Sequence, residues 1–213
     1  MRAILFVYIF AIFMSCSNNR ENAQNQHGYI IIQPKTKTIL DEQYREMNIF
    51  TVDIPDTVTY IGDFAFFGNE LEEVALPENL TEIGIGAFRD NNLKKIVIPN
   101  SVTNITLGAF ADNKLTEITI SNNISFIGSQ LFANNLLTKI IIPDNVKRIH
   151  YEAFSDNRIT EIIIGSDVKF WKTEHFNNIF GEFDELFCEY YTENNRRAGT
   201  YRYNEYLGAW EYF

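Results

Sequence analysis

Apolar residues recur in this chain with a period of 22, and the polar residues between them repeat with the same spacing. The unit can be written P-x-x-[VLI]-x-x-I-G-x-x-A-F-x-x-N-x-L-x-x-I-x-[IL]. Five copies open, in order, at Pro55, Pro77, Pro99, Ser121 and Pro143, and a degenerate sixth opens at Gly165. A fixed period in the twenties is typical of a solenoid, in which each unit forms one coil and stacks on its neighbours. The pattern therefore predicts a repeat architecture with one continuous core.

The strictest apolar column is aromatic, and its members are Phe66, Phe88, Phe110, Phe132, Phe154 and Phe176. No single unit can bury its apolar side chains alone, whereas stacked units bury each column against its own copies. Burial of each ring is expected to contribute about 1.5–3 kcal/mol. We therefore expect a spine of stacked phenylalanine rings along the solenoid.

The end of each unit, L-x-x-I-x-I, alternates with period two and is rich in β-branched residues, which predicts a short strand. The expected strands are residues 72–76, 94–98, 116–120, 138–142 and 160–164. Strands that recur once per coil in the same direction must pair in parallel. Proline follows three of these strands directly, at Pro77, Pro99 and Pro143, where the chain leaves the ladder and needs no N–H donor.

One polar column is a candidate for burial, and it consists of Asn69, Asn91, Asn113, Asn135 and Asn157. A tight turn at this position leaves backbone groups without ladder partners, and an amide side chain can both donate and accept hydrogen bonds. We therefore expect an asparagine ladder along one edge of the stack.

A stack needs caps because its terminal coils expose apolar faces. At the front, 29–32 is a short β-like run, and Ile39 and Tyr44 fall in the isoleucine and phenylalanine columns. In the degenerate last unit, Trp171 stands in the isoleucine column, and the asparagine is displaced to Asn178. Beyond it, 182–191 suits a short helix, and the alternating aromatic residues of 198–213 predict a β-hairpin turning near Leu207.

The repeats LPENLTEIGIGAFRDNNLKKIVI and IPDNVKRIHYEAFSDNRITEIII resemble the BspA-like class of leucine-rich repeats found in bacterial surface proteins, over residues 54–164. The AGTY segment at 198–201 is similar to the aromatic tails of such proteins. The resemblance implies a right-handed repeat solenoid with parallel β-strands on the concave face, a short helical or irregular convex side, and surface exposure. It also implies binding, mostly adhesion, with no catalytic activity in the repeats.

The first residues predict export. Arg2 precedes an apolar run at 3–14, which is too short for a comfortable membrane span and suits a signal peptide. The run ends in Phe13-Met14-Ser15-Cys16, which resembles a bacterial lipoprotein signal, so that Cys16 would carry lipid after cleavage. An ordinary secreted protein and a retained anchor helix are the alternatives. The expected location is the cell envelope, as an outer-membrane or cell-surface lipoprotein.

The patterns divide the chain into five segments. Residues 1–15 are expected to be the signal peptide, and the polar, aromatic-free residues 16–28 a flexible tether. Residues 29–54 form an N-terminal cap and 55–180 form the leucine-rich repeats, the last unit being degenerate. Residues 181–213 form a C-terminal cap or small module.

Composition narrows the choice of partners. The net charge of −10 argues against nucleic acid and against charge-driven binding to anionic lipid, so membrane contact is expected through the lipid anchor alone. If Cys16 is acylated, Cys188 is the one remaining cysteine and no intrachain disulfide can form, so stability must come from the core. We expect a monomer.

The sequence contains no pattern that indicates an enzyme. There is no nucleophile elbow, phosphate-binding loop or dinucleotide fingerprint, and no two histidines lie at metal-ligand spacing. His150 occupies a column that elsewhere holds glycine or threonine, and it is interpreted as a surface substitution. Acidic residues at 182–185 could act as an acid/base pair or hold calcium, although a solvated helix face is the simpler interpretation. No catalytic residue, metal or cofactor is predicted.

Binding is expected on the outward positions of the strands. One outward column alternates in sign from coil to coil and reads Glu73, Lys95, Glu117, Lys139 and Glu161. Its simplest role is a self-neutralising ladder that avoids like-charge contacts. The second outward column is β-branched or small and reads Ala75, Val97, Thr119, Ile141 and Ile163. The core does not require these apolar residues, and they reflect either plain β-propensity or a protein-binding patch centred on Ile141 and Ile163.

These features predict an exported, non-catalytic recognition protein whose concave face contacts an unidentified protein or glycan. The expected contact residues are Lys95, Val97, Glu117, Lys139, Ile141, Glu161 and Ile163. A passive envelope scaffold or assembly protein is one alternative. Carbohydrate binding through the aromatic tail is another, using Tyr190, Tyr191, Tyr201, Tyr203, Tyr206, Trp210 and Tyr212, although these rings could equally pack within a cap.

Overall fold

A computed structural model describes residues 23–26, 28–171, 178–181 and 183–213. The elements, in order, are β1 (Ala23–Gln26), β2 (Tyr29–Ile32), β3 (Thr38–Ile39), β4 (Thr51–Asp53), β5 (Tyr60–Ile61), β6 (Glu82–Ile83), β7 (Lys95–Val97), β8 (Asn104–Ile105), β9 (Glu117–Thr119), β10 (Phe126–Ile127), β11 (Lys139–Ile141), β12 (Arg148–His150), β13 (Glu161–Ile164), β14 (Lys169–Trp171), α1 (Asp184–Glu193), β15 (Gly199–Asn204) and β16 (Ala209–Tyr212).

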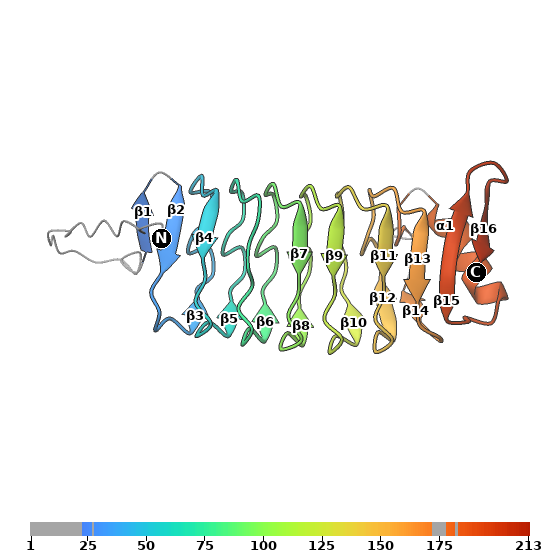
Figure 1. The fold of residues 1–213 in the computed structure, drawn as a ribbon, viewed down its shortest axis with the longest axis horizontal. Coiled ribbons are helices and arrows are strands. Elements are labelled where there is room, and N and C mark those ends of the chain that lie inside the picture. The colour runs from blue at the N-terminus through green and yellow to red at the C-terminus, as the bar shows by residue number, and fades with distance from the viewer. Residues whose placement is uncertain (1–22, 27, 172–177, 182) are drawn as a thin grey trace, which may run out of the picture.

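The coils stack side by side into a long solenoid with strands in two rows (Figure 1). The first ladder contains β2, β4, β7, β9, β11 and β13, and the second contains β3, β5, β6, β8, β10, β12 and β14. Hydrogen-bonded neighbours within each row run parallel. They form the groups β2-β4, β7-β9 and β11-β13 in the first ladder and β3-β5-β6-β8 and β10-β12-β14 in the second. In most of these pairs each residue meets the residue 22 positions later, as in Lys95 with Glu117 and Ile61 with Ile83. The predicted solenoid of parallel strands with a 22-residue repeat is confirmed.

Two features of the strands differ from the sequence prediction. The second ladder was not predicted, because its strands are two or three residues long and follow no extended alternation. No strand forms in the fully described segment 72–76, which interrupts the first ladder between β4 and β7. That segment carries Val74 and Ala75, the smallest side chains of its columns, and Ala75 has low β-propensity. The other four predicted strands are present with trimmed ends.

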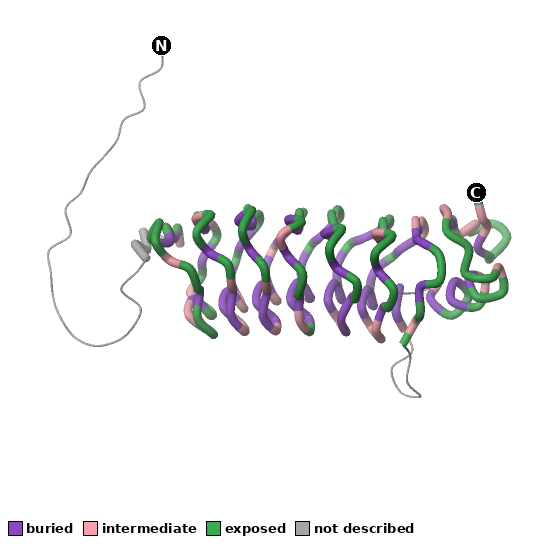
Figure 2. Tube along the Cα trace, turned by 90° about the horizontal axis from the view of Figure 1, so that it is seen from below, coloured by how far each residue is buried: buried purple, intermediate pink, exposed green. Residues whose placement is uncertain are grey.

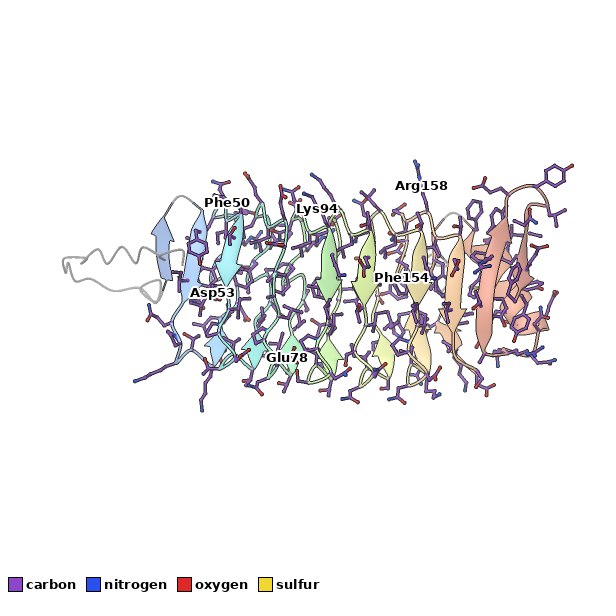
Figure 3. The ribbon with its side chains drawn as sticks, viewed as in Figure 1. Phe50, Asp53, Glu78, Lys94, Phe154 and Arg158 are labelled. Carbon is purple, nitrogen blue, oxygen red and sulfur yellow. The ribbon has the colours of Figure 1, made fainter. Side chains whose placement is uncertain are left out.

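The phenylalanine spine is the centre of the core. Rings of successive coils stack with centroids 5.2–5.8 Å apart and planes within 15° of parallel. The stack runs through Tyr44, Phe66, Phe88, Phe110, Phe132, Phe154 and Phe180, all of them buried. Buried residues recur at the same place in each coil (Figure 2), and Phe154 lies inside the stack whereas Arg158 points outward from its edge (Figure 3). The predicted spine is confirmed for the described residues.

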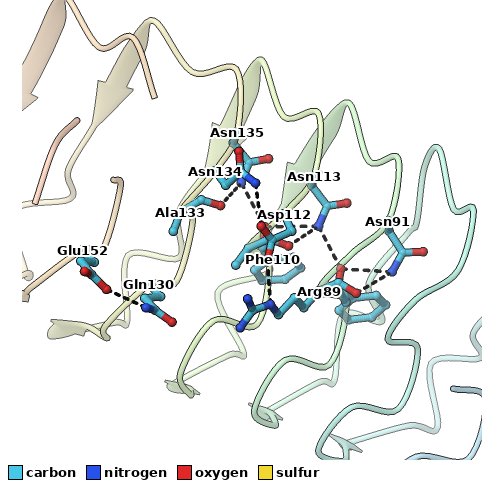
Figure 4. A network of polar contacts seen from close by, with 12 residues as sticks. Arg89, Asn91, Phe110, Asp112, Asn113, Gln130, Ala133, Asn134, Asn135 and Glu152 are labelled. Carbon is cyan, nitrogen blue, oxygen red and sulfur yellow. Dashed lines mark hydrogen bonds and ion pairs between the residues drawn. The ribbon is translucent and has the colours of Figure 1, made fainter. Parts of the chain in front are cut away.

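The asparagine ladder is also present. The Oδ1 atom of Asn113 accepts the N–H of Leu93 in the preceding coil at 3.0 Å. Its Nδ2 atom donates to the carbonyl oxygens of Phe88 and Phe110, at 2.9 and 3.3 Å, and therefore ties two coils together (Figure 4). All five predicted members are buried and share this arrangement.

The last coil departs from the expected register. Strand β14 pairs Phe170 with Ile149 and Trp171 with His150, so Phe170 occupies the inward column and the placement predicted for Trp171 is wrong. The reason is a one-residue deletion, since Val168 lies two positions before Phe170 whereas Val146 lies three before Ile149. Phe176 lies outside the described residues, and Phe180 continues the spine.

Asn178 does not extend the asparagine ladder as expected. Its Oδ1 atom accepts the N–H of Gly181 at 2.8 Å, which satisfies a local turn instead of bridging to the preceding coil. Asn178 precedes the spine residue Phe180 by two positions in the sequence. Every asparagine of the ladder instead follows its phenylalanine by three residues. The ladder therefore has Asn157 as its last described member.

Antiparallel strands close both ends of the first ladder. At the front, β1 pairs antiparallel with β2, so residues 23–26 of the predicted tether are bound to the stack. At the back, β15 pairs antiparallel with β13, and β16 completes the predicted hairpin. Helix α1, predicted at 182–191 and observed at Asp184–Glu193, packs its buried Phe187 and Tyr191 against the final coil. Reversal of strand direction ends the parallel stack and covers edges that could otherwise pair with another chain.

Each coil also contains two residues with left-handed backbone conformation. One column consists of Glu42, Phe64, Gly86, Gly108, Gln130 and Glu152, and the other of Glu46, Gly68, Asp90, Asp112, Asn134 and Asp156. All have φ between 52° and 65°. Glycine, aspartate and asparagine adopt this conformation most readily, which explains the composition of the second column. These two left-handed residues lie in the turn that connects the second ladder to the first. The asparagine that bonds to neighbouring coils follows the second of them by one residue.

The ladder predicts the effect of Asn113→Ala. Loss of the amide leaves the Leu93 N–H and the phenylalanine carbonyls unsatisfied, which should lower the free energy of unfolding by about 1–3 kcal/mol in urea titrations. Asn92→Ala is the matched control, because Asn92 is half-buried and its side chain makes no hydrogen bond to the described residues. It should change stability by less than about 0.5 kcal/mol. Equal effects of the two substitutions would contradict a stabilising role for the ladder.

Candidate partner-binding face

The first ladder presents both outward columns predicted from the sequence on one face. In β7, β9 and β11 the middle residue points inward and its two neighbours point to solvent. Register pairs Lys95 with Glu117 and Lys139 with Glu161 in the charged column, and Val97 with Thr119 and Ile141 with Ile163 in the second. We call this surface the strand face.

The charged column forms ion pairs between neighbouring coils. The Nζ of Lys95 lies 2.7 Å from Glu117 Oε1, and the Nζ of Lys139 lies 2.6 Å from Glu161 Oε1. Arg202 of the hairpin lies opposite Glu161 and contacts its other carboxylate oxygen at 3.0 Å. The alternation of charge therefore continues from the repeats into the hairpin. The sequence did not predict this contact, because β15 runs antiparallel to β13 and Arg202 lies outside the 22-residue repeat.

These contacts control the ionisation of the carboxylates. Hydrogen bonds from Lys139 and then Arg202 lower the pKa of Glu161, although partial burial opposes the shift. A similar hydrogen bond from Lys94, 2.6 Å away, lowers the pKa of the exposed Glu72. Because each pair cancels its own charge, the strand face carries a weak net field and is suited to partners without strong charge.

The apolar column is exposed unevenly. Val97 and Ile141 are 50% and 54% exposed, whereas Ile163 is only partly accessible because β15 lies beside β13. The exposed apolar surface is therefore centred on Val97 and Ile141. It lies nearer the N-terminus than the patch expected at Ile141 and Ile163. The sequence could not show this shift, since the hairpin that covers Ile163 is distant along the chain.

A groove crosses the strand face at this point. Its lining includes Val97, Thr119 and Ile141 from the outward column, the proline column at Pro99 and Pro143, and backbone and side chains of Ile98, Asn100, Ile118, Ile120, Asn122 and Glu78. Pro99 and Pro143 line one side of the groove, at the points where their coils leave the first ladder. The predicted outward column thus belongs to a shallow, mostly apolar groove that spans several coils.

The aromatic tail is mainly cap structure. Tyr191, Tyr201 and Trp210 are buried, and their rings contact Phe187 with centroids 4.9–5.9 Å apart. Burial raises the pKa of Tyr201 to about 12. Tyr206, at the hairpin turn, is 96% exposed. Most of the rings considered for sugar stacking are therefore committed to the core of the cap.

Other predicted residues occupy structural positions. Cys16 lies outside the described residues. The thiol of Cys188 is buried and lies 3.3 Å from Asp184 Oδ1, which also accepts the N–H of Phe180 at 3.2 Å. Across the described ranges, no group of three or more histidine, cysteine, aspartate or glutamate side chains could hold a metal ion. The helices in that part of the chain include none long and apolar enough to cross a membrane.

The repeats match a known protein family. The model of the BspA type leucine-rich repeat region matches residues 61–181 in six copies. The chain belongs to this family. The six BspA type repeats extend to the degenerate last coil, in agreement with the continuation of the spine to Phe180.

One solved structure has the same fold, and a second is less similar. A leucine-rich repeat protein from Eubacterium ventriosum is 24% identical, with a TM-score of 0.53 over 71% of this chain and 45% of that protein. A leucine rich cell surface protein from Faecalibacterium prausnitzii is 22% identical, with a TM-score of 0.46 over 73% of this chain and 51% of that one. The chain thus spans about half the length of these solved proteins. No match to a curated protein was found.

The ion pairs of Glu161 predict a pH-dependent contribution to stability. Because its pKa is lowered on folding from an ordinary 4.5, the contribution is present above that value and is lost as the pH falls through the lower folded pKa. Glu161→Gln should lower the free energy of unfolding by about 0.2–1 kcal/mol at pH 7 and have no effect near pH 2. Urea titrations at both pH values test this, with Glu78→Gln as the control outside the ladder. An effect of equal size at both pH values would contradict it.

Proposed function

We propose that this BspA type protein is an exported recognition protein that binds a macromolecular partner on the strand face and performs no catalysis. The observation that carries the proposal is the exposed apolar column at Val97 and Ile141, which lines a groove and is not required by the core. The family and the cell-surface description of the Faecalibacterium prausnitzii protein support a surface location.

The chemistry of the face limits the partner. Lys95, Lys139 and their glutamate neighbours neutralise each other, so a highly charged ligand gains little from them. The β-branched groove between them favours an apolar or aromatic segment as the centre of the contact, with the ion pairs at its rim. Adhesion to a host or envelope protein fits this arrangement better than passive scaffolding, which would not need an exposed apolar groove.

Membrane attachment is proposed through acylation of Cys16 after removal of residues 1–15. The support is the apolar run that ends at Ser15-Cys16. Each buried methylene of an attached acyl chain contributes about 0.8 kcal/mol, so two or more chains would hold the protein firmly.

The first test changes the groove. Ile141→Asp places a charge at its centre and should weaken partner binding at least tenfold, a change of about 1.4 kcal/mol. Immobilised protein would be exposed to extracts of host and envelope proteins, and captured proteins quantified by mass spectrometry. Leu136→Asp is the matched control, since Leu136 is 57% exposed but lies outside the groove. A partner captured equally by wild type and Ile141→Asp would show that binding occurs elsewhere.

The second test addresses the anchor. Cells expressing the wild-type protein in labelled palmitate should yield a labelled product in the membrane fraction, whereas Cys16→Ala should yield an unlabelled one. Cys188→Ala is the control and should remain labelled. Label retained on the Cys16→Ala protein would rule out this anchor.

A further inference from the structure

The second ladder carries a cluster of side chains that the sequence pattern did not reveal. Its outward positions form two rows across β10, β12 and β14. Register places Phe126, Arg148 and Lys169 in one row, and His150 and Trp171 side by side in the other. The one-residue deletion in the last coil is what brings Trp171 outward beside His150. His150 is therefore the centre of a cluster and not an isolated surface substitution.

The rings of this cluster are in contact. His150 lies between Phe126 and Trp171, with centroid distances of 4.5 and 4.8 Å. Its Nδ1 atom lies 3.3 Å from Ser129 Oγ, which fixes the imidazole. Phe126 and Trp171 remain 38% and 50% exposed. The cluster thus presents aromatic surface to solvent on both sides of a held histidine.

A cation is fixed beside this aromatic surface. The guanidinium carbon of Arg148 lies 5.3 Å from the centre of the Trp171 ring, a cation–π contact that orients its planar fork. Lys169 is exposed in the same row. Neither Arg148 nor Lys169 forms an ion pair with any of the described residues. The rows therefore contain two cations and no anion.

The same rows differ in the first half of the ladder. There they hold Tyr60, Glu82 and Asn104 in one row, and Gly62 and Gly84 in the other. A Cβ on Gly84 would lie 2.5 Å from the backbone of Gly62, so these coils approach closely without side chains. The repeat therefore requires neither rings nor cations at these positions. Their concentration at β10, β12 and β14 is a local property of a chain whose net charge is −10.

We propose that this cluster binds an acidic polysaccharide, with uronic acid units as the recognised chemistry. The π faces of Trp171 and Phe126 are negative and suit the C–H faces of sugar rings. The Arg148 fork, held beside Trp171, can bind the carboxylate of the same sugar through two parallel hydrogen bonds. Lys169 lies one strand further along the row, where it can meet the carboxylate of a following unit.

The arrangement favours this ligand over other polyanions. Charge alone would not attract one, because the chain as a whole is strongly acidic. Single-stranded nucleic acid is usually bound by a long basic groove that follows the backbone, whereas only two cations lie in these rows. A sugar acid needs one carboxylate partner and one apolar ring face per unit, which Arg148 and Trp171 supply together.

The test is affinity electrophoresis of the full chain at low salt in gels containing polygalacturonate, hyaluronate, dextran, polyglutamate or single-stranded DNA. Wild type should be retarded by at least one of the two uronic acid polymers and not by the other three. Trp171→Ala and Arg148→Ala should each raise the apparent dissociation constant at least tenfold. Phe50→Ala and Lys94→Ala, which remove an exposed ring and an exposed cation elsewhere, should leave it unchanged.

Thermal unfolding of each variant establishes that it is folded, and Lys169→Glu provides a second exposed variant that should also lose retardation. Absence of retardation in both uronic acid polymers overturns the proposal. Equal retardation by polyglutamate would show that charge alone acts, and stronger binding of single-stranded DNA would assign the cluster to nucleic acid. Loss of binding in the Phe50→Ala or Lys94→Ala protein would place the site elsewhere. The experiment does not depend on partner binding at the strand face. The Ile141→Asp protein, which is changed only on that face, should therefore be retarded like the wild type.

Discussion

The whole structure depends on stacking coils in strict register, so that each buried side chain meets its counterpart 22 residues away. The phenylalanine rings supply the apolar part of this contact, and the asparagine amides supply the polar part. The two act at adjacent positions, because the amide of Asn113 bonds to the carbonyls of Phe88 and Phe110, whose rings stack. A slip of one residue would separate the rings and leave backbone groups unsatisfied, so both interactions enforce the same register.

The register of the coils determines which positions on the surface can differ from one coil to the next. Inward positions are restricted by contact with the neighbouring coils, and Gly84 shows how close the backbones come where no side chain is accommodated. Outward positions need only avoid like charges and support the strands. On the first ladder they form ion pairs around an apolar groove. On the second ladder they change from Tyr60, Glu82, Asn104 and glycines to a cluster of rings and cations along the stack. The outer surfaces of the two ladders thus differ in chemistry although they cover the same core.

The closed ends have a comparable influence. Strand β15 extends the charged column through Arg202 and at the same time covers Ile163. Helix α1 and the hairpin bury Phe187, Tyr191, Tyr201 and Trp210, which completes the aromatic core beyond Phe180. The cap therefore stabilises the last coil and limits how much of the strand face is open to a partner. The same rings are unavailable for stacking on sugars, which separates the role of the tail from that of the cluster at His150.

The sequence by itself determined the solenoid, its 22-residue period, the Phe66–Phe154 part of the spine, the asparagine ladder and the two outward columns of the strand face. These follow from identical spacing, because stacked copies can bury like residues only against like. Only the tertiary structure decided the second ladder, the interruption at 72–76, the inward position of Phe170 and the cluster around His150. The strands concerned are too short to show periodicity. The one-residue deletion moves Phe170 to the inward position and Trp171 to the outward one. The second partners of Glu161 and Ile163, Arg202 and Thr200, come from an antiparallel hairpin outside the repeat, where spacing carries no information about contact.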